Sequence, residues 1–258
     1  MQIFAVCMEC QKELGHPSFE TFFLPYYEDR MAEIECSRHH KSVLLLQSQK
    51  FEVLLESGAN ALAERFTLEA AASFSSGLER FYEFCVKVIS AHRSMNPAIY
   101  EQMFKEMANQ SERQLGAFLV LHAIEFGSAY VPNKKIIEFR NSVIHKGRIP
   151  TPDEATGFCE RVYSEILLLT QKLEQNYRAA INKVISEDLR KRAEVVSKGI
   201  PIATTTGTMF FSLAHQDKKQ TFAEAYDAYL KSKNVIATSV PVLGVISPLL
   251  KRVIAPKK

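Results

Sequence analysis

The chain has 258 residues, of which 47% are hydrophobic and 24% are charged, and its formal net charge is +3. This composition supplies enough apolar side chains for a sizeable core and argues against an intrinsically disordered chain. The mildly basic balance neither demands nor opposes nucleic-acid binding.

The five cysteines and the apolar stretches bear on location. Only six residues precede Cys7, too few for a secretory signal, so we expect a cytoplasmic protein whose cysteines are free or metal-bound. The best candidate for a membrane span, residues 235–250, is 16 residues long and contains Pro241 and Pro248. About 20 residues are needed, so we expect no membrane-spanning segment.

Residues 1–47 alternate strand-like runs with clusters of Cys and His. The strand-like runs are residues 2–6, 32–35 and 42–47. The two clusters are Cys7 with Cys10, and Cys36 with His39 and His40. This order is the plan of a zinc ribbon, in which two turns each supply two ligands to a tetrahedral ion. We therefore predict a small β-rich, zinc-ribbon-like subdomain.

The predicted zinc ligands are Cys7, Cys10, Cys36 and either His40 or His39. We favour His40, because a C-x3-H spacing gives the second turn an extra residue. His16 is a weaker candidate. Four protein ligands leave no open coordination position, so the predicted zinc is structural rather than catalytic.

Residues 48–196 carry apolar side chains at helical spacing and show no strand signal. The expected helices are residues 50–62, 67–92, one starting at Pro97, 115–126, 134–145, and a long one from Pro152 toward Val196 that can break on the way. This pattern predicts an all-α bundle with short connections. The composition shifts at Gly199. In residues 197–258 we expect a loop or short strand, a helix at 222–230 and a basic solvated tail, and we assign this segment no role.

The end of the 134–145 helix combines three polar groups with apolar neighbours. Arg140 and Asn141 precede His145, and Gly147 then stops the helix. A guanidinium matches phosphate oxygens, and an imidazole can move a proton near neutral pH. Arg140 and His145 are five residues apart, so they occupy neighbouring faces of a regular helix unless its last turn unwinds. The set indicates a site that handles phosphate.

Other catalytic patterns are missing. The sequence contains no G-x4-G-K-[ST], G-x-G-x2-G or G-x-S-x-G motif. This argues against a P-loop NTPase, a dinucleotide-dependent dehydrogenase and an α/β-hydrolase.

The helical body, with Arg140, Asn141 and His145 near a helix end, resembles the HEPN superfamily (higher eukaryote and prokaryote nucleotide-binding domains). The family pattern is Arg, four to six residues and then His, commonly with a polar residue directly after the Arg. Residues 72–83 also look like an earlier helix of such proteins. The resemblance covers roughly residues 50–180 and implies a HEPN-like bundle at 48–196.

The resemblance implies a metal-independent endoribonuclease of antiviral defence or a toxin–antitoxin system, with RNA as substrate. His145 would act as general acid or base, Arg140 would neutralise the phosphate, and Asn141 would orient His145 or donate a hydrogen bond. Glu79 or Glu83 could position Arg140. Two motifs would meet across a homodimer, so we expect this stretch at a two-fold interface with both imidazoles facing one cleft. An antitoxin or regulatory partner could bind as well.

Two other interpretations stay open, a non-catalytic module and a zinc enzyme. Arg140 could form an ion pair with a helix acid while His145 caps the helix C-terminus, where a cation is favoured. The chain would then be a non-catalytic HEPN-type module that binds RNA or protein. A zinc enzyme is the least favoured reading, because it needs an open coordination position.

Overall fold

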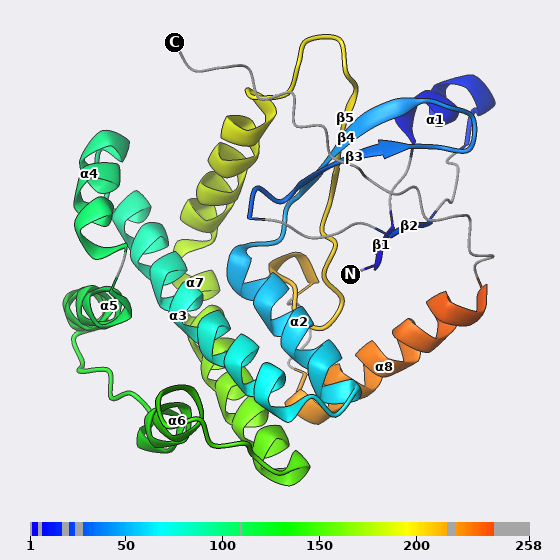
Figure 1. Ribbon diagram of the computed structural model, residues 1–258. Coiled ribbons are helices and arrows are strands. Elements are labelled where there is room, and N and C mark those ends of the chain that lie inside the picture. Colours follow the sequence, from blue (N-terminus) through cyan, green and yellow to red (C-terminus); the bar gives the residue numbers. More distant parts are fainter. Residues whose placement is uncertain are drawn as a thin grey trace.

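The structure, a computed structural model, describes residues 2–4, 7–16, 21–23, 28–108, 110–215 and 220–239. Most of these residues lie in helices, and two small sheets accompany the helical body (Figure 1). The prediction of a mainly helical fold is therefore confirmed. In the part of the chain that the structure describes, no helix is both long enough and apolar enough to cross a membrane.

The N-terminal part differs from a simple ribbon. Strand β1 (Gln2–Phe4) pairs with β2 (Thr21–Phe23), whereas β3 (Met31–Glu35) and β4 (Lys41–Leu46) form a separate antiparallel hairpin. The first cysteine pair opens a helix, α1 (Met8–Leu14), instead of a turn between two strands. The sequence of α1, MECQKEL, consists mostly of good helix formers, which explains the difference.

The helical body follows in short steps. Its first five helices are α2 (Lys50–Ala63), α3 (Thr67–His92), α4 (Pro97–Met107), α5 (Ser111–Phe126) and α6 (Lys134–Arg140). The Asn96 side chain caps α4 by accepting a hydrogen bond from the backbone of Ala98. Thr67 is the first helical residue of α3.

The long final helix of the body, α7 (Pro152–Ala193), starts at a capping box of Thr151 and Glu154. It contains the expected break: Tyr177 has φ −136° and ψ 27°, outside the helical region. The Tyr177 hydroxyl donates a hydrogen bond to Glu125 on α5, so the break coincides with a contact between helices.

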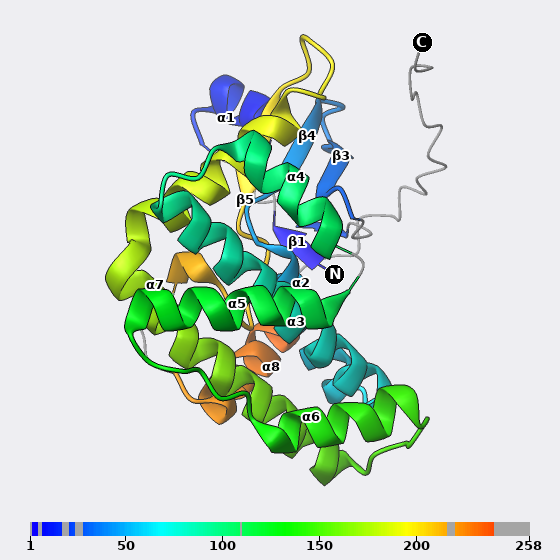
Figure 2. The ribbon, with the colours of Figure 1, turned by 90° about the vertical axis from the view of Figure 1, so that its left-hand side faces the viewer.

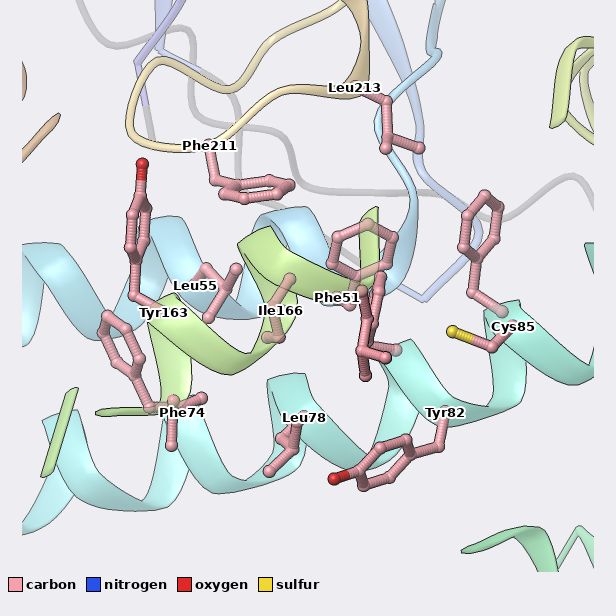
Figure 3. Close-up of a cluster of buried hydrophobic side chains, with 14 of the residues drawn as sticks. Phe51, Leu55, Phe74, Leu78, Tyr82, Cys85, Tyr163, Ile166, Phe211 and Leu213 are labelled. Atoms are coloured by element: carbon pink, nitrogen blue, oxygen red, sulfur yellow. The ribbon is translucent and has the colours of Figure 1, made fainter. Parts of the chain in front are cut away.

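The core lies between α2, α3 and α7 (Figure 3). Its largest fully buried side chains include Phe51, Phe74, Phe81, Phe158 and Ile166. Two glycines let α2 and α3 approach closely. A Cβ on Gly58 would lie 2.4 Å from the ring of Phe74, and one on Gly77 would lie 3.2 Å from Leu55. The close packing of α2 against α3 therefore depends on the absence of a Cβ atom at these two glycines.

The C-terminal segment packs against both other parts. Strand β5 (Ile202–Thr205) runs parallel to β4 and completes a three-stranded sheet in the order β3-β4-β5. Helix α8 (Phe222–Ser239) follows, and Phe222 is buried against the main core. The division of the chain at 47/48 and 196/197 stays a prediction, but contacts cross both boundaries. Residues 240–258, including the basic tail, lie outside the described residues.

Two buried acids of α2 attach the C-terminal segment. Glu52 accepts a hydrogen bond from the backbone of Leu213 at 2.8 Å, and Glu56 accepts those of Met209 and Phe210 at 3.0 and 2.8 Å. Burial raises the pKa of Glu52 to about 7, although the backbone amides of Gln49 and Leu213 oppose the shift. Burial likewise raises the pKa of Glu56. These carboxyl groups are structural anchors that the sequence did not reveal.

Candidate functional sites

The Arg140–His145 segment contains a local change of helix type. Residues Asn141–His145 form one turn of π-helix directly after α6. A π-helix has a wider turn, with hydrogen bonds between residues five apart, and such turns often occur at functional sites. Gly147, with φ +68°, ends it in the left-handed conformation that favours glycine. The turn therefore brings residues five apart onto one face.

This turn joins the guanidinium to the imidazole. Arg140 Nη1 lies 3.0 Å from His145 Nε2 and 3.4 Å from Asn141 Oδ1. Because an arginine can only donate, Nε2 accepts this hydrogen bond, and the proton of a neutral ring is on Nδ1. Asn141 contacts Arg140 rather than His145. The two predicted catalytic residues thus meet within one chain, and their offset gives no argument for a second copy.

Glu79 on α3 holds the other side of Arg140. Its Oε1 accepts a hydrogen bond from Arg140 Nη2 at 2.6 Å, and the two side chains are 26% and 23% exposed. Glu83 does not join the site, because it pairs with Arg80 at 2.7 Å. Of the two acids that the sequence offered, the structure brings Glu79 alone to the guanidinium.

One face of this segment packs on the core, and the other faces solvent. Val143 is 1% exposed and Ile136 is 5% exposed, and the Phe139 ring stacks on Phe158 of α7 at 4.6 Å between centroids. His145 is exposed. The buried Nε of Arg140 has no hydrogen-bond partner, so the guanidinium is not fully satisfied by its present contacts. A rigid support thus presents a cation and an accessible imidazole to solvent.

The second candidate site is the Cys/His cluster. Its ligand atoms come from Cys7, Cys10, Cys36 and His40, and all lie within 4.8 Å of one another. Cys10 Sγ is 3.7 Å from Cys36 Sγ, and His40 Nδ1 is 3.4 Å from Cys10 Sγ and 3.7 Å from Cys7 Sγ. Tetrahedral zinc with ordinary bond lengths sets its ligands about 3.5–3.8 Å apart. The cluster can therefore hold a metal ion.

The chemistry of the four groups fits a metal as well. Burial raises the pKa of the Cys7 thiol, but hydrogen bonds from the Cys10 backbone and the His40 side chain outweigh it, so the pKa is lowered overall. A lowered pKa favours the thiolate that binds metals. His39 is excluded from the cluster: its backbone has φ +65°, and its exposed ring pairs with Glu35 at 2.9 Å. His16 is not a member either.

Glu13 is a residue of this site that sequence reasoning missed. Its Oε1 lies 3.2 Å from His40 Nε2, the ring nitrogen opposite the Nδ1 that faces Cys7 and Cys10. A carboxylate on the second nitrogen of a metal-binding histidine orients the ring and raises its basicity. No local pattern links Glu13 to a histidine 27 residues later, so the contact emerges only after folding.

The remaining two cysteines lie in the helical body. Cys85 and Cys159 are fully buried inside α3 and α7, and burial raises the pKa of both thiols. They are ordinary core residues. Their raised pKa values contrast with the lowered pKa of Cys7 in the Cys/His cluster.

The two candidate sites lie toward opposite ends of the molecule. Helix α1, which carries part of the metal cluster, is at the top of both ribbon views, whereas α6 is at the bottom (Figures 1 and 2).

No protein-family model, curated protein or solved structure matches the chain. The geometry of the two sites therefore provides the indications of function.

Proposed function

We propose that this protein is a metal-independent endoribonuclease of the HEPN type, with Arg140, Asn141 and His145 at its site. The observation that carries the proposal is the π-helix contact, which holds His145 Nε2 3.0 Å from Arg140 Nη1. An imidazole beside a guanidinium offers proton transfer and anion recognition at one point. Cleavage of a phosphodiester requires both.

In the proposed reaction the ribose 2′-OH attacks the adjacent phosphorus and the 5′-oxygen leaves. The products are a 2′,3′-cyclic phosphate and a 5′-OH end. The phosphate oxygens would replace His145 and Asn141 as acceptors of Arg140 Nη1. His145 Nε2 would then be free to accept the 2′-OH proton, and the imidazolium so formed would return that proton to the departing 5′-oxygen. DNA would be spared because it has no 2′-OH.

The charge of the surrounding segment supports RNA as substrate. Residues 134–148 contain five basic side chains and one acidic one, in a chain whose total charge is only +3. Lys134, Lys135 and Lys146 are exposed, and none of them has an ion pair within the described residues. Unpaired lysines next to a phosphate-handling site suit contacts with a polyanion.

Exposed apolar residues support a homodimer. Ile137 and Ile144 are each 41% exposed and Ile149 is 75% exposed, all on the segment that carries the site. Apolar side chains grouped beside a site favour coverage by a partner. We propose that a second copy covers them, and that the setting is cytoplasmic antiviral defence or a toxin system. An antitoxin-like partner is a second occupant that would inhibit the site.

We further propose that the Cys/His cluster holds a structural zinc ion. Three thiolates and one imidazole are a common structural zinc set, and their spacing supports it. Cys7, Cys10, Cys36 and His40 would bind the ion and leave no open position. Zinc would therefore contribute folding and no chemistry.

The ribonuclease is tested by incubating the purified chain with labelled single-stranded RNA in EDTA. We expect fragments with 2′,3′-cyclic phosphate ends, and a rate about 10²–10⁴-fold lower for His145→Ala. His39→Ala is the matched control, because His39 is an exposed histidine outside both sites. Unchanged cutting by a folded His145→Ala variant would contradict the proposal. Expression of the wild type should also slow cell growth, and His145→Ala should relieve the effect.

One observation favours a non-catalytic module as the second candidate. Arg140 is paired with Glu79 and also bonded to His145, as in a purely structural network. RNA or protein binding without cleavage, insensitive to Arg140→Ala and His145→Ala, would support this alternative.

A further inference from the structure

Within the described residues, helix α1 contributes no aliphatic or aromatic side chain to the buried core. Met8 and Leu14 are 40% and 43% exposed, and Cys10 is the one buried residue of the helix. Cys7, Cys10 and Cys36 form a buried cluster that is separate from the main core. A helix of seven residues is also far too short to persist by itself in water. Among the described residues, the contacts that can hold α1 in place therefore centre on the Cys/His cluster.

The polar contacts of α1 with the β3–β4 hairpin lead to the same cluster. Glu13 Oε1 lies 3.2 Å from His40 Nε2, and its Oε2 lies 2.9 Å from Arg38 Nη2. The opposite ring nitrogen of His40, Nδ1, faces the sulfurs of Cys7 and Cys10. Glu13 thus fixes both the orientation of the ring and the nitrogen that it offers to a metal.

We infer that metal binding, and not apolar packing, attaches α1 to the β3–β4 hairpin, with Glu13 as the positioning residue for His40. The inference rests on the proposed metal centre. Loss of the metal releases residues 7–16, while α2, α3 and α7 keep their fold because they have a core of their own. The N-terminal end of the chain is then a unit that folds only around its ion.

Hydrogen exchange of the full chain, followed by mass spectrometry, tests the attachment. The protein is loaded with zinc and then treated with a chelator. We expect the amides of α1 to exchange at least about tenfold faster after chelation, and those of α2, α3 and α7 to keep their protection. Unchanged exchange in α1, or loss of protection throughout the helical body, would overturn the inference.

The role of Glu13 is tested with a matched pair of substitutions on α1. Glu13→Gln removes the charge that faces His40, whereas Glu9→Gln removes one that pairs with Lys12 on the same helix. Competition with a zinc chelator should show an affinity about 10–100-fold lower for Glu13→Gln and an unchanged affinity for Glu9→Gln. Equal affinities in the two variants would refute the positioning role.

The metal centre and the attachment of α1 can be refuted separately. A wild-type chain that binds no stoichiometric zinc would overturn the metal centre and this inference together. A chain that binds zinc but keeps α1 protected after chelation would overturn this inference alone. Neither measurement involves RNA cleavage, so neither outcome bears on the proposed ribonuclease activity.

Discussion

Two regions of this molecule position their polar groups by different means. The helix turn with Arg140 and His145 is held by packing against the apolar core, through Val143 and Phe139. At the Cys/His cluster the backbone has little apolar support, and the ligand atoms themselves are the contact. One geometry is imposed by packing and is present without a ligand. We propose that the other is held together by a metal ion.

This difference indicates that the two sites can be separated experimentally. A core-supported site should survive removal of the metal, because none of its contacts pass through α1. A metal-supported unit should tolerate changes in the core that leave the β3–β4 hairpin folded. Each of the following predictions tests one side of this contrast, in order of decreasing expected effect.

The largest effect is expected from Cys36→Ser. This substitution removes one of four ligands, and structural zinc sites contribute about 10–16 kcal/mol of binding free energy. We expect zinc content, measured on the purified chain, to fall from about one ion per chain to nearly none. The wild-type rate of RNA cleavage should remain, since the Arg140–His145 contact lies at the other end of the molecule. A parallel loss of cleavage would show that the two regions are coupled.

The next effect concerns the buried anchor of the C-terminal segment. The pKa of Glu52 is raised to about 7 by burial, so the folded chain keeps a proton that the unfolded chain loses at lower pH. Stability therefore falls as pH rises through the range between the unfolded pKa and about 7. Denaturation midpoints should decrease between pH 5 and pH 8 by the equivalent of roughly 3 kcal/mol.

Glu52→Gln is the control for this pH dependence. It leaves one backbone amide without its acceptor, which lowers stability by a constant amount at all pH values. The slope between pH 5 and pH 8 should become shallower than in the wild type. An identical slope in both proteins would assign the pH dependence to other groups. Zinc content should not change, because Glu52 belongs to the packed region.

A smaller effect is expected where α2 and α3 pack most closely. In Gly58→Ala the new methyl group would lie 2.4 Å from the ring of Phe74, which is fully buried and cannot move aside freely. We expect a loss of about 1–3 kcal/mol in denaturant unfolding, partly offset by the better helix propensity of Ala. Gly116→Ala is the matched control, because nothing lies within 4 Å of its new methyl group. That variant should gain slight stability.

How far the sequence predicted the structure also differs between the two regions. The helices of the body were predicted, because apolar spacing and caps such as Asn96 and Thr151 are local signals. The grouping of Cys7, Cys10, Cys36 and His40 was predicted too, with His40 in place of His39, because the spacing within each of the two Cys/His motifs is a local signal. The helix at the first cysteine pair was not predicted. The ribbon pattern indicated a turn there, although the residues of α1 have high helix propensity.

Long-range contacts account for the rest. The pairing of β5 with β4 joins residues more than 150 positions apart, and no local pattern announces it. The choice of Glu79 over Glu83, one helical turn away, depends on how α3 faces α6. The π-helix turn was foreseen only as an unwinding that would be needed for Arg140 and His145 to meet. Within this turn the side chain of Val143 is buried in the core.

The smallest predicted effect tests whether packing alone fixes Arg140. Glu79 holds the guanidinium from α3 through a partly buried ion pair, for which about 1 kcal/mol is a reasonable contribution. If this contact orients Arg140 toward the phosphate, Glu79→Gln should lower kcat for RNA cleavage about fivefold. Binding of RNA should change little or strengthen, because a negative charge near the phosphate is removed.

Glu83→Gln is the matched control, since Glu83 lies on the same helix but pairs with Arg80. It should cleave RNA at the wild-type rate. A similar loss in both variants would mean that the charge of α3 acts at a distance and that Glu79 has no special role. No loss in either would mean that the π-helix turn and its apolar anchors hold Arg140 without help, so that the core alone shapes this site.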